Sequence, residues 1–96
     1  MFFLVGHVEL YFPSSSSLKE KRMIVSSLVN RIRKRFNISI SEVAYHELWQ
    51  RTILGFSAVG SNSLEMDKFT SFIEDSLYNN ALDLEVTDFS YEIISR

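Results

Sequence analysis

Cysteine is absent from this 96-residue chain, which also has only one proline and three glycines. Without cysteine there is no disulfide framework, no thiolate nucleophile and no zinc site with cysteine ligands. This absence suits a reducing compartment, so we expect a cytoplasmic protein. Three glycines cannot supply the G-x-G-x-x-G loop that binds dinucleotide phosphates, and Gly55 and Gly60 lack the Lys and Ser/Thr that complete a P-loop.

Long hydrophobic runs are also missing. The apolar start of the chain, Met1 to Val5, has no basic flank and is followed within a few residues by His7 and Glu9. It has neither the length of a membrane span nor the pattern of a signal peptide, so we expect no membrane contact. A chain of this size buries roughly two thirds of its unfolded surface in one core. We therefore expect a single domain over residues 1–96.

Catalytic signatures are scarce as well. His46-Glu47-Leu48-Trp49-Gln50 approaches the zinc motif H-E-x-x-H, but Gln50 stands where the second imidazole ligand must be. No serine has both glycines of the G-x-S-x-G nucleophile elbow. His7 and Glu9 share a strand face, and His46 from another strand would be needed to complete a metal site with them. We predict no enzyme activity, no metal and no cofactor.

What the chain does have is a strong separation of charge. Residues 1–60 contain eight Lys or Arg and four Asp or Glu, a net +4, whereas residues 61–96 contain two and eight, a net −6. Seven of the ten basic residues lie between Lys19 and Arg35. This polarity favours an oriented partner or an electrostatically matched self-contact.

Periodicity predicts the elements of the first half. Residues 2–12 alternate as a strand that Pro13 ends, and apolar residues from Leu18 to Phe36 recur at the spacing of one helical face. Ser17 is placed as the N-cap of this helix, with Glu20 as its capping-box partner. Residues 38–46 and 51–60 read as two strands of a hairpin, and a change of parity within residues 38–45 indicates a bulge.

A second helix and a last strand complete the pattern. Asn62 and Glu65 form another capping-box signal, after which apolar residues follow at helical spacing: Met66, Phe69, Ile73 and Leu77. A run rich in Val, Phe, Tyr and Ile from about Leu82 to Ile94 predicts the final strand. The order strand, helix, strand, strand, helix, strand predicts an α+β ferredoxin-like βαββαβ sandwich, a four-stranded antiparallel sheet with both helices on one face.

Such a sheet leaves one face bare, and here that face is apolar. Its expected members, which we predict to serve in self-association as a homodimer or higher oligomer, are Phe3, Val5, Tyr11, Ile53 and Val59. RNA-recognition modules stack bases on the same kind of face, but residues 51–60 lack their basic, glycine-rich aromatic motif.

The basic first helix is open to two interpretations. Charged residues on a helix are usually a solvated face. However, basic side chains at a helix start oppose the helix dipole at a cost of roughly 0.3–1 kcal/mol each, which favours a functional reason for them. Arg51, beside Trp49 and Gln50, could clamp an anion or stack on a base. The residues that we predict to bind RNA or another anion are Lys19, Lys21, Arg22 and Arg51.

Two motifs carry a resemblance to a known family. Ser17-Leu18-Lys19-Glu20-Lys21-Arg22 and the later Leu48-Trp49-Gln50-Arg51 resemble the YlxP-like family of small bacterial proteins, a domain of unknown function. The resemblance covers nearly the whole chain and implies the ferredoxin-like fold. Members are often encoded beside genes for ribosome maturation and translation initiation, which implies a role near ribosome assembly or RNA. This chain departs from the family at Tyr45-His46-Glu47, where the family has a smaller, more acidic turn.

The functional prediction is therefore a cytoplasmic binding factor that contacts structured RNA or a ribosomal particle through its basic first helix. The alternative is a non-catalytic oligomeric module for protein interaction or structure, without nucleic-acid contact.

Overall fold

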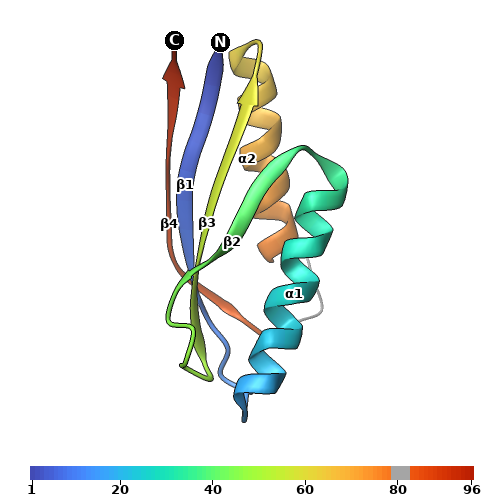
Figure 1. The fold of residues 1–96 in the computed structure, drawn as a ribbon, viewed down its shortest axis with the longest axis vertical. Helices are drawn as coiled ribbons and strands as arrows, with labels where there is room; N and C mark the ends of the chain where they lie inside the picture. The colour runs from blue at the N-terminus through green and yellow to red at the C-terminus, as the bar shows by residue number, and fades with distance from the viewer. Residues whose placement is uncertain (79–82) are drawn as a thin grey trace.

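The computed structural model describes residues 1–78 and 83–96, and it has the predicted order of elements. The strands and helices are β1 (Phe2–Tyr11), α1 (Leu18–Arg35), β2 (Ile38–Ala44), β3 (Arg51–Gly60), α2 (Ser63–Tyr78) and β4 (Glu85–Ser95). The four strands form one antiparallel sheet in the order β2-β3-β1-β4. Both helices lie on one side of this sheet (Figure 1). The predicted βαββαβ sandwich is confirmed.

Strand β1 lies at the centre of the sheet and pairs along its whole length with β3, from Phe2 opposite Gly60 to Tyr11 opposite Arg51. On its other side β1 pairs with β4, and the two chain ends meet where Met1 and Arg96 exchange backbone hydrogen bonds of 2.8 Å. Figure 1 shows both ends at the same end of the sheet.

The core lies between the sheet and the two helices. Even-numbered residues of β1 face it, because successive side chains of a strand point to opposite faces. Its most deeply buried members, each at most 4% exposed, are Leu4, Val8, Leu10, Phe12, Leu28, Ile32, Ile38, Ile40, Leu54, Phe56, Met66, Ile73 and Leu77. The four apolar residues predicted for the inner stripe of α2 are all buried. Odd-numbered residues of β1 lie on the opposite, open face of the sheet.

Both predicted helix starts are confirmed. The Ser17 hydroxyl accepts from the Glu20 backbone N–H at 3.1 Å, and Asn62 Oδ1 accepts from the Glu65 backbone N–H at 3.0 Å. In a standard capping box the glutamate carboxylate accepts a hydrogen bond from the backbone N–H of the N-cap residue. Here the carboxylates of Glu20 and Glu65 instead accept from the N–H of the residue before the N-cap, Ser16 and Ser61 respectively.

The predicted bulge in β2 is also present, since the register with β3 shifts between Glu42 and Ala44. A second irregularity, which the sequence did not predict, shifts the register of β4 against β1 at Glu9 and Leu10. Strand β4 begins at Glu85, and Leu82, where the sequence placed its start, lies outside the described residues.

Candidate functional site

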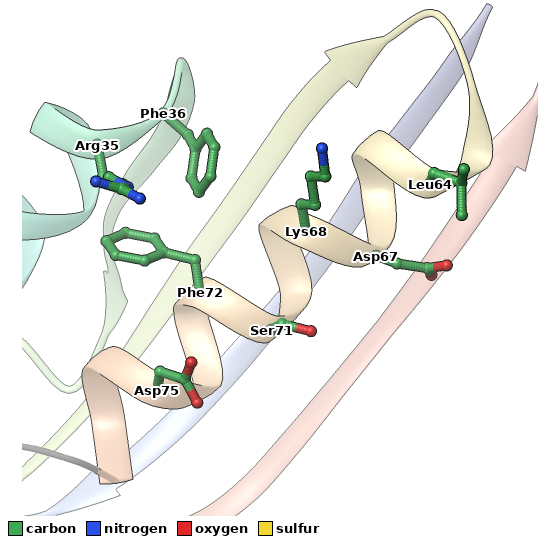
Figure 2. A pocket seen from close by; sticks show the side chains of 8 residues that line it. All are labelled: Arg35, Phe36, Leu64, Asp67, Lys68, Ser71, Phe72 and Asp75. Atoms are coloured by element: carbon green, nitrogen blue, oxygen red, sulfur yellow. The ribbon is translucent and has the colours of Figure 1, made fainter.

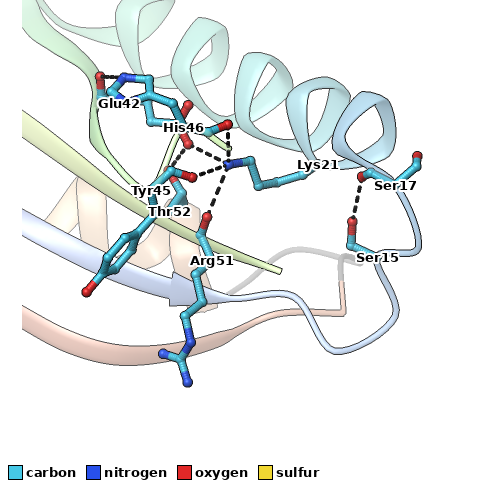
Figure 3. Close-up of polar contacts among 8 residues, drawn as sticks. All are labelled: Ser15, Ser17, Lys21, Glu42, Tyr45, His46, Arg51 and Thr52. Carbon is cyan, nitrogen blue, oxygen red and sulfur yellow. Dashed lines mark hydrogen bonds and ion pairs between the residues drawn. The ribbon is translucent and has the colours of Figure 1, made fainter. Parts of the chain in front are cut away.

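Lys21 lies on the inner side of α1 and is completely buried. Its ammonium donates to the backbone carbonyls of Tyr45 at 2.7 Å, His46 at 3.3 Å and Arg51 at 3.2 Å. It also lies 3.0 Å from a carboxylate oxygen of Glu42. Figure 3 shows the ammonium surrounded by these oxygens. The Lys21 side chain therefore connects helix α1 to the turn of the β2–β3 hairpin through hydrogen bonds and an ion pair.

The prediction that Lys21 binds RNA is wrong, because its ammonium has no solvent contact and all its donors are engaged within the fold. A signal for this was present in the sequence. Lys21 precedes Val25 by four residues and Leu28 by seven, so it falls on the apolar stripe of the helix. A lysine on that stripe must find an acidic or carbonyl partner when it is buried.

Lys19 and Arg22, by contrast, are exposed on the side of α1 away from the sheet. They line a shallow groove of about 530 Å³ with four uncharged residues of the same helix: Met23, Ser26, Ser27 and Asn30. Arg31 and Lys34 are also exposed and follow Ser27 and Asn30 by four residues, so they continue this surface. We call these eight residues the outer face of α1.

Among the described residues, no acidic side chain forms an ion pair with the cations of the outer face. Within residues 1–78 and 83–96 the ion pairs are His7–Asp88, Lys21–Glu42 and Arg51–Glu9. The one acidic residue of α1, Glu20, is hydrogen-bonded to Ser16 instead, whose hydroxyl donates to the Glu20 carboxylate at 2.8 Å. These hydrogen bonds from the hydroxyl and backbone N–H of Ser16 lower the pKa of Glu20 below its ordinary value of 4.5.

Arg51 does not join the outer face of α1. Its guanidinium lies 5.3 Å from the centre of the Tyr11 ring and 3.4 Å from a carboxylate oxygen of Glu9, on the open face of the sheet. In Figure 3 it points away from Lys21. The four residues predicted as one anion site are therefore divided among the outer face, the interior and the open face.

Trp49 and Leu48 are both exposed in the turn beside Arg51, and with Tyr11 and Gln50 they line a small hollow of about 340 Å³. Gln50 itself donates to the Pro13 and Ser15 carbonyls at 3.2 Å, so its amide holds the loop before α1. The hollow thus has an aromatic and cationic lining but no free amide.

The five residues predicted for self-association do share the open face of the sheet. Phe3 is opposite Val59 in the register, and Glu9 is opposite Ile53. Val59 is 65% exposed and Val5 44% exposed, whereas Phe3, Tyr11 and Ile53 are partly covered. Near the middle of this face His7 Nε2 lies 2.9 Å from Asp88 Oδ2, which interrupts the apolar surface with a polar pair.

A larger groove of about 740 Å³ runs between the end of α1 and α2. Figure 2 shows Phe36 and Phe72 facing each other in it, with Arg35 beside them. The two rings meet edge to face at 5.2 Å. Its charged lining residues are Arg35, Lys68, Asp67 and Asp75, so this groove carries both signs of charge, unlike the outer face of α1.

The described part of the chain gathers no set of three His, Asp or Glu side chains that could hold a metal ion. The two histidines have different partners: His46 Nε2 lies 3.1 Å from the Glu42 carbonyl oxygen, and His7 Nε2 lies 2.9 Å from Asp88 Oδ2. Neither helix among these residues has the length and hydrophobicity needed to span a bilayer.

Comparison with solved structures gives a match over the whole chain. The fold is similar to the crystal structure of a dimeric ferredoxin-like protein from an uncultured marine organism, with a TM-score of 0.54. The match covers 100% of this chain and 98% of that one at 13% sequence identity. This likeness shows the fold alone, and it confirms the predicted ferredoxin-like architecture.

Comparison of sequences gives the family. The chain is 43% identical over 54 residues to the uncharacterized protein YlxP of Bacillus subtilis (strain 168), a match that covers 56% of this chain and 59% of that protein. The aligned part thus spans little more than half of the relative's length. Residues 3–91 match the family described as a protein of unknown function, DUF503. The predicted YlxP-like resemblance is confirmed, and the chain belongs to the DUF503 family.

Proposed function

We propose that this protein binds structured RNA by holding phosphates along the outer face of α1. The observation that carries the proposal is a set of exposed cations, unpaired with any described acidic residue, on one side of one helix. Lys19 and Lys34 are fifteen residues apart, which corresponds to roughly 22 Å of helix. That length is enough for several consecutive phosphate contacts.

The residues between the cations suit a phosphate backbone. Ser26, Ser27 and Asn30 are small and polar, so a backbone can approach the helix there and accept hydrogen bonds from hydroxyl and amide groups. The acidic residues of the neighbouring helix α2, such as Asp67 and Asp75, would repel the same backbone and keep it on α1. Contacts of this kind position RNA without reading its sequence.

A paired comparison of variants tests the proposal. Replacing Arg22 and Lys34 with Ala removes two cations of the outer face. Replacing Lys68 and Arg96 with Ala removes the same charge elsewhere. We expect the first variant to bind ribosomal RNA fragments at least tenfold more weakly than the wild type, and the second to bind within about twofold. Equal loss in both variants would mean that only net charge matters, and no binding by the wild type would reject the proposal.

The second candidate is a protein-interaction module that uses the open face of the sheet. Its support is the exposure of Val5 and Val59 beside partly covered Phe3 and Ile53, an apolar surface of the kind that protein partners cover. The solved structure of similar fold is described as dimeric, which agrees with a second copy as that partner. This candidate predicts that Val59→Lys abolishes self-association.

A further inference from the structure

We infer that β4 forms an antiparallel pair with β4 of a second copy, which joins the two four-stranded sheets edge to edge. The starting observation is the unpaired side of β4. This strand is eleven residues long, and among the described residues only β1 pairs with it. Figure 1 shows β4 as the outermost strand, with no described element beyond it. Its outer N–H and C=O groups can therefore bind another strand.

The opposite edge of the sheet is much less suited to pairing. Strand β2 has only seven residues, and the bulge between Glu42 and Ala44 interrupts its register. Arg33 of α1 also donates to the Ile40 carbonyl of β2 at 2.6 Å. Short length, a bulge and a nearby cation are the usual features that protect an edge strand from pairing. Because β4 is longer and lacks a cation along residues 85–95, the two edges are not equivalent.

Strand β4 carries partly exposed apolar side chains next to its free edge. On the side of the sheet that the helices cover, α2 leaves Tyr91 43% and Ile93 37% exposed. Phe89, on the same side, is partly buried and contacts the Tyr91 ring edge to face at 5.8 Å. A neighbouring strand at this edge would cover these three side chains, which solvent otherwise reaches.

The sequence of β4 is complementary to itself when the two copies pair about a two-fold axis at Tyr91. A two-fold axis at Tyr91 places each Phe89 opposite Ile93 of the second copy and the two Tyr91 rings opposite each other. On the open face it places Ser90 opposite Glu92. An axis at Ser90 would set Asp88 against Glu92, and an axis at Glu92 would set two carboxylates together, which is unfavourable for directly opposed residues. The axis at Tyr91 avoids both of these pairings and is favoured over the two neighbouring axes.

The charges at the two ends of β4 favour a second copy of this chain as the partner of its free edge. Antiparallel pairing brings Arg96 of one chain to the acidic start of the other β4, where Glu85 lies. An isologous contact makes this attraction twice, because both chains present the same surface. The outer face of α1 and the open face of the sheet stay free in this arrangement, so the pairing does not depend on the proposed RNA contact.

The test begins with the mass of the purified protein in solution, measured by light scattering over a range of concentrations. We expect a species of twice the 11.2 kDa chain mass. Tyr91→Lys should weaken the dimer at least tenfold, because it places two ammonium groups at the axis. Val59→Lys, at a more exposed strand position on the open face (65% exposed, against 43% for Tyr91), should leave the dimer intact. Circular dichroism checks that both variants fold.

A cross-linking measurement provides a second readout that does not require weakening the dimer. The chain has no cysteine, so Tyr91→Cys introduces a single thiol at the axis. We expect this variant to form a disulfide-linked dimer under mild oxidation, whereas Glu85→Cys, far from the axis on the same strand, should not. A wild type that stays monomeric at every concentration, dissociation by Val59→Lys but not by Tyr91→Lys, or absent cross-linking in the Tyr91→Cys variant would each overturn the inference.

Discussion

The Lys21 ammonium has no contact with water, yet four oxygen atoms surround it. Burial of a charge is costly unless it is paired and hydrogen-bonded, and here both conditions are met. Glu42 is in turn held by the Thr52 hydroxyl, which donates to its carboxylate at 2.5 Å. Helix α1 is thus joined to the hairpin by a small polar network inside an otherwise apolar layer.

Removal of Lys21 should therefore destabilise the fold. In Lys21→Met we expect a loss of about 3 kcal/mol in the free energy of unfolding, because Glu42 and three carbonyls lose their donor. Lys19→Met, an exposed neighbour, should change it by less than about 0.5 kcal/mol. Urea denaturation measures both. Adding Glu42→Leu to Lys21→Met should recover part of the lost stability, because it removes the carboxylate left without its partner. A loss below about 1 kcal/mol in Lys21→Met alone would contradict the structural role of Lys21.

Ser16 controls the titration of Glu20. The lowered pKa of this carboxyl means that its ionised form stabilises the folded protein above the unfolded pKa and that the contribution disappears as pH falls through the folded pKa. In Ser16→Ala the pKa of Glu20 should rise toward 4.5, since the hydroxyl donor is lost while the backbone N–H remains. An NMR titration would show this, with Ser26→Ala as an unaffected control. An unchanged pKa would assign the shift to another cause.

At the scale of elements, most of the architecture followed from periodicity and helix caps. The alternation in β1 and the spacing in α2 correctly identified the buried residues, because apolar burial is the main driving force and leaves a regular pattern. Lys21 and Arg51 were assigned wrongly to one surface, because a charge was equated with exposure. Only the register of β3 against β1 places Arg51 opposite Tyr11 on the open face.

Close packing of β1 against β4 gives a prediction for Gly6. A Cβ at this position would lie 2.5 Å from the Ser90 carbonyl oxygen and 2.7 Å from both the Phe56 ring and Tyr91 Cβ. We expect Gly6→Ala to lower the free energy of unfolding by roughly 1–3 kcal/mol through overpacking. At Gly55 the added carbon would meet only Val43, at 3.0 Å, so Gly55→Ala should cost less. Equal losses in thermal denaturation would contradict this account.

At the scale of the whole molecule, the separation of charge along the sequence becomes a separation between neighbouring helices. Basic α1 carries the outer face, and acidic α2 lies beside it with no basic residue in its last turn. A protein of net charge −2 can still attract RNA when its cations share one surface. The edge pairing of β4 would present two such surfaces in one dimer.

The salt dependence of RNA binding by the wild-type protein tests the proposed function most directly. Four phosphate contacts, one for each cation of the outer face, predict that affinity for a structured ribosomal RNA fragment falls roughly 50- to 150-fold between about 50 and 200 mM salt. Arg22→Ala/Lys34→Ala should about halve the slope of log affinity against log salt concentration. Affinity that stays constant over this range, or a slope that the variant does not change, would contradict phosphate binding by α1.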